Sequence, residues 1–440
     1  MNVHWSLSSA VRLSPRRAGL RSAHDNTAEV LVRIQAPDAP AGHTAERPPQ
    51  AVALVIDRSG SMSGPPIAQA RRCAEYVVGA LRPADTVSLV QFDHRVRRLW
   101  PAVPLGDGAA VRAAIASIQA GGQTDLHGGW AVGADTLVDV GGSGLKRVIL
   151  LSDGQANQGL TDTAAIASQC ERQAACGITT STYGLGKNFN EDLMVAMARA
   201  GGGNPYYGDT AEDLMEPFQQ ELELLGKLCL RELRLNVDAP DGVTVSMVND
   251  LPRLQGGWRL PDLAWGAEAW AVLRLDIAAL ALPKSGERMT VLRVGVNGVS
   301  LEGEPVVLER AGLALPVLAA AAHGALTEDE LVQRRLTELA AASTMARMRE
   351  AAAAERWDNV DQLLAEATHQ FAGNEWVASV IESMKAIALS RSRERLSKEA
   401  LYTASRLSSR LTARDEPAMD PRGAGPAYLR RKSSQGKDEF

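Results

Sequence analysis

An acidic turn directly after a buried strand constrains this sequence more than any other feature. Residues 51–56 read Ala-Val-Ala-Leu-Val-Ile, an apolar run typical of a strand covered on both faces. Asp57, Ser59 and Ser61 follow this run, and a helix is expected at 66–81. A strand that ends in oxygen-bearing side chains and then opens into a helix predicts an α/β fold with a parallel sheet. Because open sheets of this kind bind ligands at their carboxyl edge, the turn is a candidate binding site.

Two later segments bring further oxygen atoms to the same predicted edge. Thr124 lies in the glycine-rich stretch 121–125, ahead of an expected helix, and Asp153 follows an apolar strand expected at 147–152. An Asp-x-Ser-x-Ser turn alone is a weak signal. Three ordered segments, each placed at the end of a strand or before a helix, make a strong one.

These segments resemble the metal-ion-dependent adhesion site of the von Willebrand factor A-type (VWA) domain, as found in bacterial multidomain proteins. The resemblance extends over about residues 45–225. It implies a domain that binds other proteins through a metal ion, and it implies that Asp57 and Asp153 bind this ion directly or through water. One departure is Asp125, where relatives often carry Asn. An extra negative charge there is expected to lower the affinity for an acidic partner. The full set of metal ligands implied is Asp57, Ser59, Ser61, Thr124 and Asp153.

Oxygen ligands of this kind favour a hard cation. They suit Mg²⁺, with Mn²⁺ next and Ca²⁺ as a further candidate, and they disfavour zinc and copper. Ser59 and Ser61 alternate along an extended turn, so both hydroxyls can point toward one ion. A vacant coordination position would attract an Asp or Glu of a partner protein. From the residues alone, the same turn could instead cap the helix at 66–81, and His127 is interpreted as a solvated or capping side chain rather than a ligand.

Strands and helices alternate from residue 50 to residue 227, which predicts a doubly wound, mostly parallel, six-stranded sheet covered by helices on both faces. The strand at 95–100 follows its neighbour after a very short turn and is therefore expected to be an antiparallel edge strand. The expected strands are 51–56, 86–92, 95–100, 147–152, 179–185 and 205–207, and the expected helices are 66–81, 107–119, 126–138, 161–175, 190–200 and 211–225.

The pattern changes near residue 228 to short strands separated by turns, which is typical of a β-sandwich. Two N-terminal strands, near 3–13 and 27–35, have no place in the α/β sheet and are expected to join this sandwich, so that the α/β domain is inserted in it or flanked by it. The predicted domains are the N-terminal strands (1–44), the VWA domain (45–227), the β-sandwich (228–312), a helical domain (313–412) and a disordered tail (413–440).

Composition limits the partners. The net charge of −5 and the aromatic content of 4% argue against a nucleic-acid surface, and no apolar run is long enough to cross a membrane. No signal peptide is visible, and the four cysteines show no Cys-x-x-Cys spacing. The expectation is a cytoplasmic protein with no membrane and no nucleic-acid partner.

The function predicted from these features is a metal-dependent protein-interaction scaffold that is not an enzyme. Neither a P-loop nor a Gly-x-Ser-x-Gly motif is present. Two alternatives stay open: an Mg²⁺-dependent hydrolase, and a structural assembly subunit whose metal site is vestigial. The resemblance also implies possible association with an ATPase, kinase or phosphatase assembly.

Overall fold

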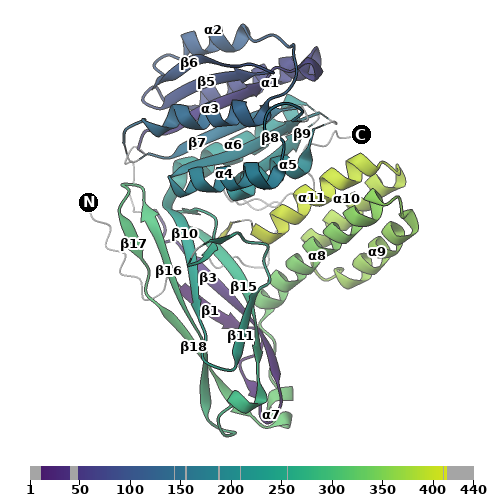
Figure 1. The fold of residues 1–440 in the computed structure, drawn as a ribbon. Coiled ribbons are helices and arrows are strands. Elements are labelled where there is room, and N and C mark those ends of the chain that lie inside the picture. Colours follow the sequence, from purple (N-terminus) through teal and green to yellow (C-terminus); the bar gives the residue numbers. More distant parts are fainter. Residues whose placement is uncertain are drawn as a thin grey trace. The chain divides into compact units, whose positions relative to one another are not determined.

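The protein folds into two compact units in the computed structural model, each of which draws on separate parts of the sequence (Figure 1). The first unit contains residues 48–227 and 394–402, and the second contains residues 11–39, 228–393 and 403–413. The structure describes residues 11–39, 48–142, 144–153, 156–186, 189–208, 210–254, 256–409 and 411–413.

The first unit is built on a six-stranded sheet with the strand order β6-β5-β4-β7-β8-β9. All neighbouring strands are parallel except β5 and β6, which are antiparallel. The predicted mostly parallel sheet with an antiparallel edge strand is therefore confirmed. The strands are β4 (Ala51–Asp57), β5 (Thr86–Phe92), β6 (Val96–Pro104), β7 (Lys146–Ser152), β8 (Ile178–Leu185) and β9 (Gly202–Gly208).

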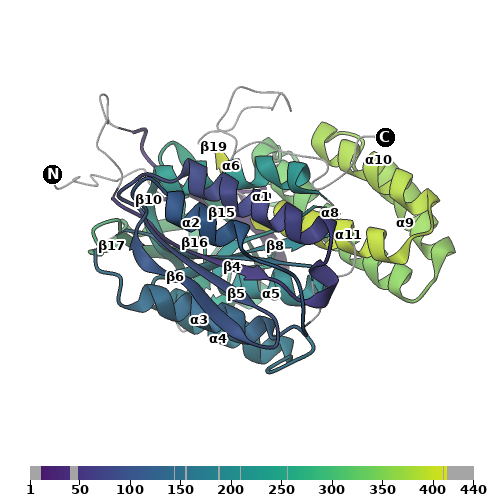
Figure 2. The ribbon, with the colours of Figure 1, turned by 90° about the horizontal axis from the view of Figure 1, so that it is seen from above.

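Helices cover both faces of this sheet, as Figure 2 shows. Strand β4 is continuously apolar because both of its faces are buried. Val52, Leu54 and Ile56 pack into the core beneath α1, α2 and α6, whereas Ala53 and Val55 pack into the core beneath α3, α4 and α5. The helices are α1 (Pro65–Ala80), α2 (Ala109–Ala116), α3 (Leu126–Val138), α4 (Thr163–Ala175), α5 (Glu191–Ala200) and α6 (Ala211–Lys227).

Glycines bring α3 close to the sheet. A Cβ atom on Gly133 would lie 2.3 Å from a methyl carbon of Val55, and one on Gly129 would lie 2.4 Å from the ring of Phe92. Neither position can carry a larger side chain without moving the helix. This close packing fixes the start of α3, and with it the glycine-rich loop that precedes the helix.

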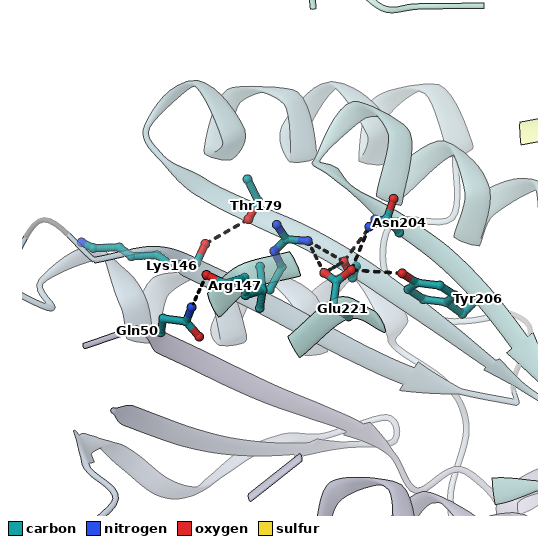
Figure 3. Close-up of polar contacts among 9 residues, drawn as sticks. Gln50, Lys146, Arg147, Thr179, Asn204, Tyr206 and Glu221 are labelled. Carbon is teal, nitrogen blue, oxygen red and sulfur yellow. Dashed lines mark hydrogen bonds and ion pairs between the residues drawn. The ribbon is translucent and has the colours of Figure 1, made fainter. Parts of the chain in front are cut away.

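A buried polar network joins α6 to the far end of the sheet (Figure 3). Arg147, near the start of β7, forms an ion pair with Glu221 of α6, and both side chains are almost fully buried. Ser181 donates to Glu221 at 2.7 Å, and Asn204 donates to it at 2.8 Å. The Tyr206 hydroxyl also donates to Glu221, at 3.2 Å. These donors compensate the buried carboxylate, and they attach α6 at the end of the sheet opposite to the ends of β4 and β7.

The second unit contains two sheets with the strand orders β1-β3-β15-β11 and β12-β13-β10-β16-β18-β2. Neighbouring strands in these orders are antiparallel except β18 and β2, which are parallel. Strand β3 pairs with β15 from Asn26↔Ile277 to Glu268↔Gln35, so the N-terminal strands pair with strands that come after the first unit in the sequence. The limits of the predicted domains stay predictions. The main strands are β1 (Val11–Pro15), β2 (Leu20–Arg21), β3 (Asn26–Gln35), β10 (Leu228–Asp238), β11 (Val243–Met247), β12 (Arg253–Leu254), β13 (Gly257–Arg259), β15 (Ala267–Ile277) and β16 (Arg288–Ser300).

The longest strand that was not expected from the sequence is β18. Strand β18 (Ala311–Leu318) pairs with β16, so the region predicted as helical from residue 313 begins with a strand. Pro316 lies opposite Arg288 in this pairing and removes one backbone donor from the strand. The shorter strands β14 (Leu263–Ala264), β17 (Pro305–Val307) and β19 (Thr412–Ala413) pair at the borders of these sheets.

Helices complete the C-terminal part. Asp329 caps α8 by accepting a hydrogen bond from the Val332 amide at 3.0 Å. The helices are α7 (Ala320–Gly324), α8 (Glu330–Ala353), α9 (Trp357–Gln370), α10 (Glu375–Leu389) and α11 (Arg393–Ser409). The predicted disordered tail lies outside the described residues except for Ala413, as do residues 3–10 of the first expected strand. Within the described chain, no helix is both long enough and apolar enough to span a bilayer.

Candidate metal centre

The predicted ligands lie on loops at the carboxyl edge of the six-stranded sheet. Asp57 is the last residue of β4, and Asp153 follows β7, the strand that pairs with β4. Ser59 and Ser61 lie in the turn after Asp57, around the short helix η1 (Gly60–Met62). Neighbouring parallel strands therefore bring the two carboxylates to one place, as the sequence predicted.

Hydrogen bonds connect four of the five predicted residues. The Asp57 carboxylate accepts a hydrogen bond from the Ser59 amide at 2.8 Å and another from the Ser152 hydroxyl at 2.5 Å. The Ser59 and Ser61 hydroxyl oxygens are 3.1 Å apart. Ser61 in turn donates to Asp153 Oδ1 at 3.1 Å. The two serine hydroxyls and the two carboxylates thus form one continuous polar cluster, to which Ser152 was not expected to contribute.

Thr124 comes to this cluster on the glycine-rich loop. The Gly60 amide donates to the Gly122 carbonyl at 2.9 Å, and the Gly121 amide donates to the Arg58 carbonyl at 2.6 Å. These bonds join the loop to the turn that carries the serines. Thr124 itself is buried, and its backbone amide donates to the Asn157 side chain at 2.9 Å. The structure therefore places the loop of Thr124 beside the cluster, whereas none of these bonds uses its hydroxyl.

Asn157 was missed by the sequence analysis. Its side-chain oxygen accepts a hydrogen bond from the Thr124 backbone amide, and its backbone amide donates to the Thr124 carbonyl at 3.1 Å. The only signal was an Asn a few residues after Asp153, in a loop rich in small polar residues. Asparagine commonly bonds to backbone groups in such loops, so this signal is not specific.

The electrostatics of the cluster favour a bound cation. Burial, followed by the negative charge of Asp57, raises the pKa of Asp153 to about 6, and the hydrogen bond from Ser61 offsets part of this rise. Asp57 is fully buried, and 8% of the Asp153 surface is exposed. Two buried carboxylates that repel one another are costly without a cation between them. A divalent ion would remove that repulsion.

The donor set decides which cations fit. Among the described residues, no three His, Cys, Asp or Glu side chains are grouped so that they could share a metal. An ion at this edge would therefore depend on two carboxylates, on the hydroxyls and on water. Such a set of oxygen donors fits Mg²⁺, which usually keeps several water ligands.

Asp125 and His127 have roles other than metal binding. The Asp125 carboxylate caps α3 by accepting a hydrogen bond from the Gly128 amide at 2.9 Å. The positive end of the α3 dipole offsets part of its charge, which weakens the expected effect on an acidic partner. The His127 ring bonds to Gln169 of α4 at 2.9 Å and lies against Trp130, at 6.0 Å between centroids.

A second charged pair, which the sequence analysis did not place at the site, lies beside the cluster. Arg58, between Asp57 and Ser59, forms an ion pair with Asp93 in the turn that joins β5 to β6. Asp93 is fully buried, and 26% of the Arg58 side chain is exposed. The position of Asp93 directly after a strand was the available signal. A single acid at that position is equally typical of a hairpin turn.

The doubly wound sheet and its acid-and-hydroxyl edge define an α/β domain with a candidate cation site. Residues 51–221 match the model of the von Willebrand factor type A domain, and the chain therefore contains a domain of this family. Domains of this family support a protein-interaction or adhesion role.

The similarity to individual proteins is moderate. The chain is 28% identical over 197 residues to the protein YfbK of Escherichia coli (strain K12). This match covers 44% of this chain and 34% of YfbK. It is 25% identical over 212 residues to the protein sll0103 of Synechocystis sp., with 47% of this chain and 49% of that protein covered. The chain thus spans a third to a half of the length of these curated relatives. A solved structure, a von Willebrand factor type A protein from Catenulispora acidiphila, has a TM-score of 0.67 at 16% identity and covers 85% of this chain and 90% of its own. At that identity the likeness concerns the fold alone.

Proposed function

We propose that the first unit binds Mg²⁺ at Asp57, Ser59, Ser61, Thr124 and Asp153, and that the bound ion takes an Asp or Glu side chain of a partner protein. The chain is then a metal-dependent interaction scaffold rather than an enzyme. The observation that carries this proposal is the continuous cluster in which Ser59, Ser61 and Asp153 are linked by hydrogen bonds of 3.1 Å.

The charge of the site supports the role of an acidic ligand. Asp57 and Asp153 together carry two negative charges when ionised, which balance a divalent ion. A neutral centre with uncharged hydroxyl and water ligands accepts one more carboxylate more readily than a centre with three or four acidic ligands does. Mn²⁺ and Ca²⁺ also bind oxygen ligands and stay candidates beside Mg²⁺.

Titration calorimetry of the full chain with Mg²⁺ tests the metal site. We expect one Mg²⁺ per chain for the natural protein and no measurable binding for Asp153→Ala. At Thr124, Thr124→Ser keeps the hydroxyl and should keep the affinity, whereas the isosteric Thr124→Val should lose most of it. Asp135→Ala, an exposed acid on α3, is the matched control and should bind as the natural protein does. Equal Mg²⁺ binding by all these variants would overturn the proposal.

The partner is tested by recovery from a lysate with Mg²⁺ and then with EDTA. A partner that depends on the site is retained by the natural protein and by Asp135→Ala, and it is lost with EDTA or with Asp153→Ala. Replacement of single Asp and Glu residues of the recovered protein then locates the acidic ligand. Retention in EDTA would show that the metal is not needed for this contact.

A further inference from the structure

We propose that the Arg58–Asp93 ion pair sets the affinity of the metal centre through its charge. The negative charge of Asp93 raises the affinity for a divalent cation. The positive charge of Arg58 cancels this effect, so that the affinity is the one that Asp57 and Asp153 give by themselves. Both are positioning residues that do not bind the metal themselves. This inference rests on the proposed metal site, and it adds two residues that the Asp-x-Ser-x-Ser pattern leaves undefined.

The ion pair is built into the three loops that form the site. Arg58 donates to the Asp93 carboxylate and to the Gln119 carbonyl, the latter at 2.8 Å. Asp93 Oδ1 also accepts a hydrogen bond from the Arg95 amide at 2.6 Å, and it lies 3.3 Å from the His94 ring nitrogen. Asp93 is therefore a fully buried carboxylate whose one close guanidinium partner among these contacts comes from the metal-binding turn.

Backbone hydrogen bonds also connect the loops that carry Arg58 and Asp93. The Arg58 amide donates to the Phe92 carbonyl at 2.8 Å, and the Asp125 amide donates to the Asp93 carbonyl at 2.9 Å. Gly122 has a φ of +88°, and a Cβ atom there would lie 2.9 Å from the Asp93 carboxylate. Only glycine fits this position. The glycine-rich loop that carries Thr124 consequently lies directly against Asp93.

The charges near the site give the pair its expected effect. Asp57 and Asp153 balance a divalent ion, and Asp93 would add a third carboxylate within the same group of loops. Arg58 cancels this third charge. Charges in partly buried surroundings interact more strongly than the same charges in water, and salt screens them less than exposed ones. Removing either partner should therefore change the affinity for the cation, and the two changes should have opposite signs.

A purely geometric role makes a different prediction. If the pair only held the loops in place, loss of either partner would displace the serine hydroxyls or Thr124 and would weaken metal binding in both cases. Arg58→Lys separates the two explanations further. It keeps the positive charge but loses the planar fork that bonds to Asp93 and to Gln119 at once.

The test is calorimetric titration of the full chain with Mg²⁺ alone. We expect Asp93→Asn to weaken binding roughly tenfold and Arg58→Gln to strengthen it by a similar factor, as expected for one uncompensated charge near a divalent ion. Arg58→Lys and the double variant Arg58→Gln/Asp93→Asn should bind within about threefold of the natural protein, because they restore the charge balance. The inference would be overturned if Asp93→Asn and Arg58→Gln both weakened Mg²⁺ binding. It would also be overturned if Arg58→Lys and Arg58→Gln changed the affinity by the same amount.

Two further ion pairs of the same unit are matched controls. Arg72 and Glu212 form an exposed pair, and Arg147 and Glu221 form a buried pair at the opposite end of the sheet. Arg72→Gln and Glu221→Gln should leave the Mg²⁺ affinity unchanged, although Glu221→Gln should lower the melting temperature. Metal-free melting curves show that each variant is folded. If the natural protein binds no Mg²⁺, the proposed function itself fails. If it binds Mg²⁺ and the signs are not opposite, only the role of the ion pair fails.

Discussion

At the scale of single residues, the raised pKa of Asp153 makes protons and metal ions competitors. Burial and the Asp57 charge raise this pKa to about 6 in the metal-free fold, above the value of about 4 of an unfolded chain. A pKa raised by folding means that Asp153 contributes most to stability when it is protonated, below about pH 4, and that this contribution is lost as the pH rises through about 6. A metal ion needs the ionised carboxylate.

The prediction at this scale is that Mg²⁺ stabilises the fold more at pH 7.5 than at pH 5. At pH 7.5 the ion binds without displacing a proton, and it replaces the repulsion between Asp57 and Asp153 with attraction. At pH 5 it must first release the proton from Asp153. Melting temperatures with and without Mg²⁺ at both pH values measure the difference. Asp153→Asn, which has no proton to release, should lose both the shift and its pH dependence. An equal shift at the two pH values in the natural protein would contradict this account.

At the scale of elements, the type and direction of a strand follow from its local sequence. The continuous apolar run at 51–56 and the short turn after Phe92 determine the type and direction of their strands, and both were predicted correctly. The carboxylate cluster follows from strand order, because β4 and β7 are neighbours. Asp93 and Asn157 could not be assigned to the site in this way. Their roles depend on which loops meet in space, and single acids or amides after strands occur in many proteins for other reasons.

The buried network on α6 is the second element-scale feature. Arg147 and Glu221 form a pair that donors from β8 and β9 complete. We expect Arg147→Met to lower the free energy of unfolding by about 3–5 kcal/mol, because Glu221 is then a buried charge without its cation. The double variant Arg147→Met/Glu221→Met should lose less than the sum of the single changes, since it leaves no unpaired charge. Urea unfolding of the four proteins measures this coupling. Additive losses would show that the pair acts as two separate side chains.

At the scale of the whole molecule, the first compact unit is completed by residues far away in the sequence. Residues 394–402, the first half of α11, belong to this unit. The Tyr402 ring lies 4.6 Å from that of Tyr207 and 6.4 Å from that of Phe189, with only 1% of its surface exposed. Tyr207 donates a hydrogen bond to Glu399. The sequence of α11 gave no indication of this packing, because nothing in it specifies the core that the helix enters.

This packing predicts that the VWA fold depends on α11. Tyr402→Ala should lower the free energy of unfolding of the first unit by about 3–5 kcal/mol, as for other buried aromatic side chains. Glu394→Ala, an exposed position of the same helix, should change it by less than about 0.5 kcal/mol. Hydrogen exchange of the central strands β4 and β7 at increasing urea concentration reports on this unit. Phe189 lies just before the N-cap residue of α5, and Tyr207 lies near the carboxyl end of β9. The loss of Tyr402 should therefore also increase hydrogen exchange in the first turn of α5. Equal stability of Tyr402→Ala and Glu394→Ala would show that α11 only lies against a unit that is already complete without it.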